Sequence, residues 1–125
     1  MKSAKQLVSE ANQQIETLTP DEAIKLAADE NVVFVDLREP AEVEKDSLPG
    51  AVHVPRGLLE FQVDPQSPSH NTRLAGNKKL VLYCGSGGRS ALATKALKDM
   101  GVTNVAHVAG GFPALQQAAK ARQKL

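Results

Sequence analysis

The amino-acid sequence predicts an α/β fold around a mainly parallel β-sheet, and two observations carry this prediction. First, the runs Val32–Val35 and Leu80–Tyr83 are apolar and lack polar alternation. Such runs are typical of strands that are covered by helices on both faces. Second, segments with helical spacing alternate with these runs along the chain, and this alternation favours a parallel sheet.

Residues 1–18 are predicted to form an N-terminal helical extension that packs on the domain. Apolar residues recur in this segment at steps of three and four, as on one face of a helix. They are Ala4, Leu7, Val8, Ala11, Ile15 and Leu18. An appendage that contacts a partner or a second subunit is the alternative. Residues 19–125 are predicted to form one domain.

The elements of this domain follow from local signals. Thr19 precedes Pro20, and Glu22 stands three residues after Thr19, which is the pattern of a capped helix start. The other predicted elements are a short helix from Pro40, a short strand over 52–54, a helical turn over 57–61, a surface loop over 63–73, a helix after residue 90, a strand over 105–108 and a last helix from about Pro113.

Composition limits the function classes. The chain has 125 residues, enough for one domain with a buried core. Its net charge of +1 gives no overall attraction to nucleic acid or a membrane surface, and no apolar run is long enough to span a bilayer. The first residues lack the apolar stretch of a signal peptide. We therefore expect a cytoplasmic protein, monomeric or homodimeric, that binds neither nucleic acid nor membrane.

The cysteine and histidine content argues against disulfides and metal sites. The single cysteine, Cys84, excludes an internal disulfide. One cysteine and three scattered histidines show no metal-ligand spacing, so no metal is expected. We interpret His53, His70 and His107 as surface residues or satisfied structural residues.

The most informative segment is Cys84-Gly85-Ser86-Gly87-Gly88-Arg89, which follows a predicted strand and precedes a predicted helix. In α/β sheets, ligands bind at the carboxyl ends of the strands. Glycines let successive backbone N–H groups turn inward around an anion, and a helix N-terminus adds partial positive charge. These features and the Arg89 guanidinium should lower the pKa of Cys84 from its ordinary value of about 8.5. The prediction is a nucleophilic cysteine in an anion cradle, and a buried, unreactive cysteine is the alternative.

Two other glycine-rich phosphate loops are excluded by spacing. A Walker loop needs a lysine before its Ser or Thr, whereas this chain has Arg89 before Ser90. A dinucleotide fingerprint needs Gly-x-Gly-x-x-Gly, whereas the glycines here are residues 85, 87 and 88.

Several segments, in this order, resemble the rhodanese (thiosulfate sulfurtransferase) family over about residues 19–115. Asp36-Leu37-Arg38 followed by Glu42 resembles the Asp-Val-Arg…Glu segment of that family, and LPGAVHVP at 48–55 resembles its Ile-Pro-Gly-Ala-x-x-x-Pro element. Residues 84–90 resemble its active-site loop, and Gly110-Gly111-Phe112 resembles its late Gly-Gly turn. The resemblance implies a single-domain, three-layer α/β/α fold.

The resemblance also implies a reaction. Cys84 would take a sulfur atom from thiosulfate, or from a protein or small-molecule persulfide, and would become a persulfide itself. Cyanide or a thiol would then accept the sulfur, and no other cofactor is needed. The residues expected to bind the persulfide and the anionic donor are Gly85, Ser86, Gly87, Gly88 and Arg89.

Four further residues receive expected roles. Arg56 is a second candidate anion contact, and a solvated surface arginine is its alternative. Asp36, Arg38 and Glu42 are expected to support the site structurally.

Rival functions stay open at this point. Phosphatases and arsenate reductases also use Cys, backbone amides and Arg, but with five residues between Cys and Arg, whereas this loop has the four residues 85–88. No acidic residue in the loop offers a general acid. A sulfur-relay or binding module that acts only with a protein partner is not separated from a free enzyme by sequence. The start of the loop resembles mercaptopyruvate sulfurtransferases, but Arg89 favours a doubly charged donor such as thiosulfate.

Overall fold

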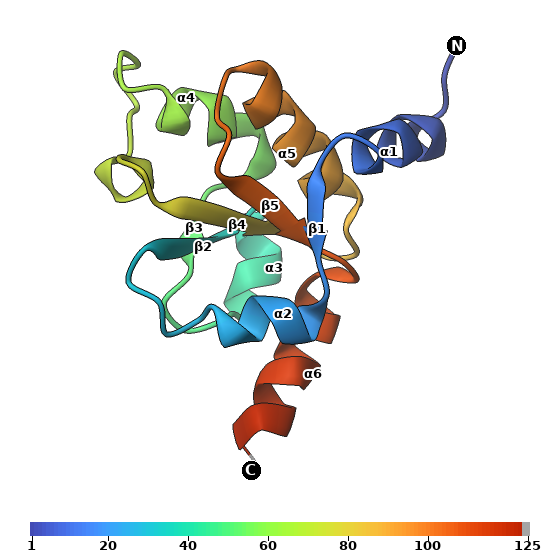
Figure 1. Ribbon diagram of the computed structural model, residues 1–125, viewed down its shortest axis with the longest axis vertical. Coiled ribbons are helices and arrows are strands. Elements are labelled where there is room, and N and C mark those ends of the chain that lie inside the picture. Colours follow the sequence, from blue (N-terminus) through green and yellow to red (C-terminus); the bar gives the residue numbers. More distant parts are fainter. Residues whose placement is uncertain (124–125) are drawn as a thin grey trace.

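The computed structural model describes residues 1–123, which fold around a five-stranded parallel sheet (Figure 1). The strands are β1 (Glu16–Leu18), β2 (Val32–Asp36), β3 (Val52–His53), β4 (Lys79–Tyr83) and β5 (Val105–Val108). Their order is β1-β5-β4-β2-β3, so β4 is the middle strand. The predicted α/β class with a mainly parallel sheet is confirmed.

Helices cover both faces of this sheet (Figure 1). They are α1 (Ala4–Asn12), α2 (Pro20–Lys25), α3 (Pro40–Lys45), α4 (Leu59–Val63), α5 (Gly88–Asp99) and α6 (Gly111–Gln123), with short 3₁₀ turns η1 (Arg56–Leu58) and η2 (Thr72–Leu74). Helices α4 and α5 lie on one face, and α2 and α6 on the other. The result is the expected three-layer α/β/α arrangement.

The middle strand shows why its sequence carries no polar alternation. Leu80 and Leu82 pack on the α5 side of the sheet, in one apolar core with Leu97. Val81 and Tyr83 pack on the α6 side, in a second core with Leu115. Because both faces of β4 are buried, every residue from Leu80 to Tyr83 is apolar or aromatic.

The predicted helix start at Thr19 is confirmed as a capping box. The Glu22 backbone N–H donates to the Thr19 hydroxyl at 3.1 Å, and the Thr19 N–H donates to the Glu22 carboxylate at 2.9 Å. Each side chain thus satisfies a backbone donor that the helix leaves free.

The N-terminal prediction is wrong at its end. The helix stops at Asn12, and Glu16–Leu18 forms the edge strand β1, with Leu18 paired to Val108 of β5. The spacing of Ile15 and Leu18 continued the helical pattern by coincidence, because a three-residue strand is too short to display its own period. The segment therefore contains a helix that packs on α5 and a strand that belongs to the sheet.

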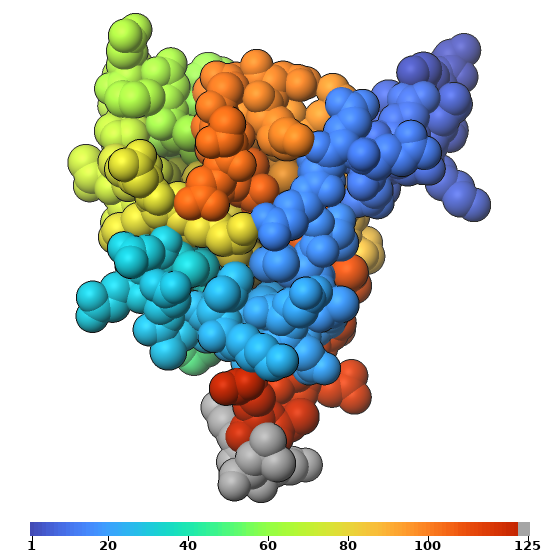
Figure 2. Space-filling view, viewed as in Figure 1, coloured from blue at the N-terminus to red at the C-terminus, as the bar shows by residue number. Residues whose placement is uncertain are grey.

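The two ends of the described chain lie far apart on the molecule. Figure 2 shows the N-terminal residues projecting at one corner and the end of α6 projecting at another. Within residues 1–123, no helix is long and apolar enough to cross a membrane. The last two residues of the predicted domain, 124 and 125, lie outside the described part.

Candidate active site

Cys84 directly follows β4, at the carboxyl edge of the sheet. The chain turns through Gly85 to Gly87, and α5 begins at Gly88. Gly87 caps this helix with φ of 112°, a left-handed conformation that favours glycine. The Cys84 side chain is fully buried, whereas residues 85–89 around it are half-buried or exposed. The residues of the loop therefore lie between the Cys84 side chain and solvent.

The Cys84 sulfur lies at the focus of several hydrogen bonds. The backbone N–H groups of Gly87 and Ser90 donate to Sγ at 3.1 and 3.3 Å. The thiol in turn lies 3.5 Å from the Ser90 hydroxyl oxygen and donates to it. Burial disfavours the thiolate, but the hydrogen bonds from Ser90 and the loop amides outweigh burial and lower the pKa of Cys84. Two backbone donors thus point at the sulfur, and its use as an anion cradle stays a prediction.

Arg89 is held by Glu42 in a forked ion pair. Its two terminal nitrogens donate to the two Glu42 carboxylate oxygens at 2.7 and 3.0 Å. The hydrogen bonds from Arg89 lower the pKa of Glu42 to about 2, and the bonds to Glu42 raise the pKa of Arg89 above its ordinary range. Each side chain is 38% exposed. Arg89 was expected to bind the anionic donor. In the structure its positive charge is largely balanced by the Glu42 carboxylate.

Asp36 and Arg38 form a buried structural clamp beside this pair. The Arg38 Nε and Nη2 donate to the Asp36 carboxylate at 3.0 and 2.9 Å, and Nη2 also donates to the Asp46 carbonyl. The guanidinium stacks 4.0 Å above the centre of the Phe112 ring. These contacts tie the end of β2 to the start of α6, and the supporting role expected for both residues stays a prediction.

The Gly110-Gly111 turn packs directly against the cysteine loop. A Cβ atom on Gly111 would lie 2.6 Å from the carbonyl oxygens of Cys84 and Gly85, closer than side chains and backbone approach in proteins. The Phe112 N–H donates to the Cys84 carbonyl at 2.7 Å. The late glycine pair is therefore needed to hold the backbone of the loop from behind.

Arg56 takes a different position from the one expected. Its side chain donates to the Glu60 carboxylate at 2.8 Å, one helical turn further on. Among the described residues, no hydrogen bond joins Arg56 to the loop 84–89. The anion contact expected of Arg56 stays a prediction, and the structure gives this arginine a local partner instead.

His107 is the residue whose connection to the site sequence reasoning missed. It is 2% exposed, and its Nδ1 lies 2.9 Å from the Ser90 hydroxyl, the same group that contacts the Cys84 sulfur. Burial lowers the pKa of His107. The available signal was its place near the carboxyl end of the strand 105–108, on the edge of the sheet where Cys84 lies.

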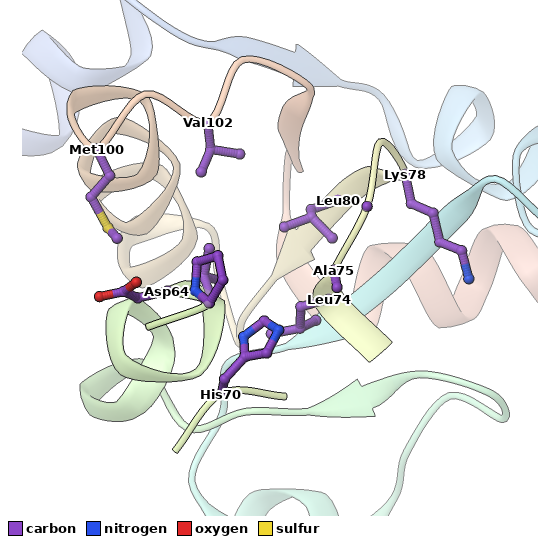
Figure 3. Close-up of a pocket in the computed structure, with 11 residues that line it drawn as sticks. Asp64, His70, Leu74, Ala75, Lys78, Leu80, Met100 and Val102 are labelled. Atoms are coloured by element: carbon purple, nitrogen blue, oxygen red, sulfur yellow. The ribbon is translucent and has the colours of Figure 1, made fainter. Parts of the chain in front are cut away.

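Two hollows of the surface differ in their relation to the site. A cavity of about 460 Å³ lies at the opposite end of β4, with Leu80, Met100 and Val102 in its walls and His70 at its rim (Figure 3). A shallow cleft of about 380 Å³ borders the cysteine loop and His107. Over the described residues, no group of three or more His, Cys, Asp or Glu side chains is arranged to hold a metal ion.

The fold, the loop and its supports match a known family. The family model described as Rhodanese-like domain matches residues 19–118. The chain belongs to this family. The predicted resemblance is therefore confirmed over most of the chain.

Two curated relatives carry sulfur chemistry in their names. A sulfurtransferase of Allochromatium vinosum is 32% identical over 88 residues, covering 70% of this chain and 75% of that protein. The Bacillus subtilis sulfur carrier protein YrkF is 33% identical over 88 residues, covering 70% of this chain. The chain spans only 43% of YrkF and 52% of another relative, slr1261 of Synechocystis. Sulfur transfer and sulfur carriage are thus the printed functions of two relatives from the same family.

Two solved structures extend the comparison. The human single-domain sulfurtransferase TSTD1 superposes with a TM-score of 0.67 and 26% identity, over 81% of this chain and 95% of that one. The Rhodopseudomonas palustris protein RPA3614, a protein of unknown function named as a possible tyrosine phosphatase, has a TM-score of 0.89 and 46% identity, over 94% of this chain and 92% of its own. Both superpositions agree with the family assignment.

Proposed function

We propose that this protein is a sulfurtransferase that carries sulfane sulfur as a persulfide on Cys84. The observation that carries the proposal is the pair of backbone amides, of Gly87 and Ser90, that donate to the Cys84 sulfur at 3.1 and 3.3 Å. Such donors stabilise an anion on sulfur, whether it is the attacking thiolate or the persulfide product. Thiosulfate, or a small-molecule or protein persulfide, is the proposed donor.

The proposed reaction has two displacement steps. The Cys84 thiolate attacks the outer sulfur of thiosulfate, the sulfur–sulfur bond of the donor breaks, and sulfite leaves with the electron pair. The acceptor, cyanide or a thiolate, then attacks the outer sulfur of the persulfide, and the Cys84 thiolate leaves. Neither step needs a cofactor besides the persulfide itself.

The cellular location, the partner and the oligomeric state are also proposals. We propose a cytoplasmic location, because free thiols as acceptors and a single unpaired cysteine both suit a reducing compartment. A protein partner that supplies or removes the sulfur is the alternative to small-molecule turnover, since the chain has no second cysteine that would discharge Cys84. A monomer or homodimer is expected.

A phosphatase is the second candidate, on the strength of the 46% identity to RPA3614. One feature disfavours it: only Gly85 to Gly88 separate Cys84 from Arg89, which makes a tight loop around the sulfur. Hydrolysis of an aryl phosphate by the purified protein is the direct test of this candidate.

The main experiment is sulfur loading followed by intact-protein mass measurement. Protein mixed with thiosulfate should gain the mass of one sulfur atom, and cyanide should remove it and release thiocyanate. Cys84→Ser should abolish both the mass gain and thiocyanate release, because the nucleophile is lost. Ser69→Ala, on an exposed loop, is the matched control and should turn over normally.

The outcomes separate the candidates. Turnover that persists in Cys84→Ser would overturn the mechanism. Loading by mercaptopyruvate or by a protein persulfide, but not by thiosulfate, would change the donor and leave the Cys84 chemistry in place. Aryl phosphate hydrolysis without sulfur loading would favour the phosphatase.

A further inference from the structure

We propose that His107 is a positioning residue for Cys84, acting through Ser90 as the far end of a proton relay that Asn12 orients. The proposal rests on the proposed role of Cys84 as nucleophile. It adds a residue of strand β5 and a residue of helix α1 to the groups that act on that cysteine.

The relay is a continuous series of hydrogen bonds from the sulfur to the surface. Cys84 Sγ lies 3.5 Å from Ser90 Oγ, and Ser90 Oγ lies 2.9 Å from His107 Nδ1. On the other side of the ring, Nε2 lies 3.0 Å from Asn12 Oδ1 and 3.2 Å from Thr17 Oγ1. The first three side chains are at most 2% exposed, whereas Asn12 and Thr17 are exposed.

The partners of the ring fix its tautomer. The amide oxygen of Asn12 can only accept, so Nε2 of His107 carries the hydrogen and donates to it. Nδ1 must then accept. The single hydrogen of the Ser90 hydroxyl has two acceptors within reach, Nδ1 at 2.9 Å and the Gly87 carbonyl oxygen at 3.2 Å, and Nδ1 is the nearer. The lone pairs of Ser90 Oγ are thereby left to accept from the Cys84 thiol. When the Ser90 hydrogen points to Nδ1, all the bonds of the series run in one direction, from sulfur to surface.

This direction provides a path for the thiol proton. The S–H proton passes to Ser90 Oγ as the Ser90 proton passes to His107 Nδ1. The products are a Cys84 thiolate and a His107 imidazolium, with Ser90 now donating to the sulfur. No atom or electron is gained or lost, and the imidazolium balances the new negative charge. Burial lowers the pKa of His107 and so favours the neutral ring at rest, and the negative charge formed on the sulfur is what stabilises the imidazolium when the proton arrives.

The His107 side chain makes its hydrogen bonds only within the relay, among the described residues. Its hydrogen-bonding partners in the described chain, Ser90, Asn12 and Thr17, are all uncharged. Charged side chains on the neighbouring elements have other partners or face solvent. The paired ones are Glu10 with Lys2, Lys98 with the Gln14 carbonyl, Glu16 with Lys79, Lys95 with Asp99 and Arg89 with Glu42, and Lys5 of α1 is exposed. The shallow cleft that His107 shares with Asn12 and Ser86 gives solvent a way to the outer end of the relay.

The N-terminal segment acquires a role through Asn12. Both Asn12 and Thr17 precede the region 19–118 that the family model matches. Helix α1 packs along α5, and Val8 approaches the start of α5 at Gly88, where a Cβ would lie 3.8 Å from it. This packing brings Asn12 to the ring, so the helix completes the relay from outside the matched domain.

The test is the pH dependence of Cys84 alkylation by iodoacetamide, which requires no sulfur donor. His107→Gln can hydrogen-bond but cannot hold the extra proton, so the alkylation midpoint should rise by about one pH unit, with about tenfold slower alkylation near neutral pH. Asn12→Asp places a carboxylate at Nε2, stabilises the imidazolium and should move the midpoint the other way. His70→Gln, at the distant cavity, is the matched control and should leave the midpoint unchanged.

The outcomes are decisive for the relay and separate it from the proposed function. A folded His107→Gln protein with an unchanged midpoint would overturn the proposal. If His107→Gln does not fold, the exposed Asn12→Asp variant decides alone: a lowered midpoint supports the relay and an unchanged one refutes it. Sulfur loading is measured in parallel, and its absence in the parent protein would refute the sulfurtransferase while the alkylation result still judges the relay.

Discussion

The two sides of Cys84 differ in charge and in exposure to solvent. On one side Arg89 and Glu42 form an ion pair in which each side chain is 38% exposed. On the other side Ser90 and His107 form a buried, uncharged series of hydrogen bonds. The charged side can attract or reject ions at the mouth of the loop, whereas the uncharged side can move a proton without exposing a charge to water. Binding of ions and transfer of the thiol proton are therefore assigned to different sides of Cys84.

The two sides also differ in what they contribute to stability. An exposed ion pair contributes about 0–1 kcal/mol, because solvent screens it and two long side chains are immobilised. A buried polar group left without its partner costs about 1–3 kcal/mol. The following three predictions test whether this contrast is real.

The largest effect is expected on the buried side. Ser90→Ala should lower the free energy of unfolding by about 1–3 kcal/mol, because His107 Nδ1 loses its donor in a site closed to water. Urea denaturation measures the difference, with Ser69→Ala on the exposed loop as the control, expected within about 0.5 kcal/mol of the parent. If Ser90→Ala is as stable as the control, the buried hydrogen bonds contribute no more to stability than the exposed ion pair does.

A smaller effect, of opposite sign in two variants, is expected on the charged side. Glu42→Gln frees the Arg89 guanidinium and should lower the apparent KM for thiosulfate, whereas Arg89→Ala leaves an unpaired carboxylate and should raise it. A change of about fivefold corresponds to an interaction of about 1 kcal/mol. Steady-state thiocyanate release measures both. Changes in the same direction would mean that the pair acts by holding the loop and not by its charge.

The smallest effect is the acid dependence of the ion pair. The pKa of Glu42 falls from 4.5 to about 2 on folding, so its contribution is complete above about pH 4.5 and is lost as pH falls through about 2. Because the pair is partly exposed, this contribution is at most about 1 kcal/mol. The stability difference between the parent and Glu42→Gln should therefore shrink across this window, as measured by urea denaturation at several pH values. Glu44→Gln, on the exposed side of α3, is the control, and an equal trend in it would contradict the assignment.

Sequence reasoning reached the parts of the molecule whose causes are local. The strands around Phe34 and Leu82 follow from apolar runs, and the capping box at Thr19 follows from residues three apart. Cys84 and its glycine loop stood out because every residue of the cradle is contiguous in the chain. Features of this kind can be predicted from the sequence alone, since the residues that cause them are neighbours in it.

The parts that escaped prediction depend on contacts between distant segments. The Arg89–Glu42 pair joins residues 47 positions apart, and the His107–Asn12 contact joins residues 95 positions apart. The residues next to His107 in the sequence do not distinguish it from a structural histidine. Its contacts depend on the position of β5 in the sheet and on the packing of helix α1 against it. The strand β1 was missed for the same reason, because its three residues are fixed by pairing to β5 and not by their own pattern.

The contact between Gly111 and the backbone of Cys84 has a consequence for how the site is assembled. The loop is closed from behind by residues that are made almost thirty positions later, through a glycine with no room for a side chain and through the Phe112 N–H. A growing chain that has emerged only as far as α5 holds its cysteine but lacks the wall that shapes the cradle. The cradle therefore takes its shape only when Gly111 and Phe112 have joined the fold, well after the cysteine itself has been made.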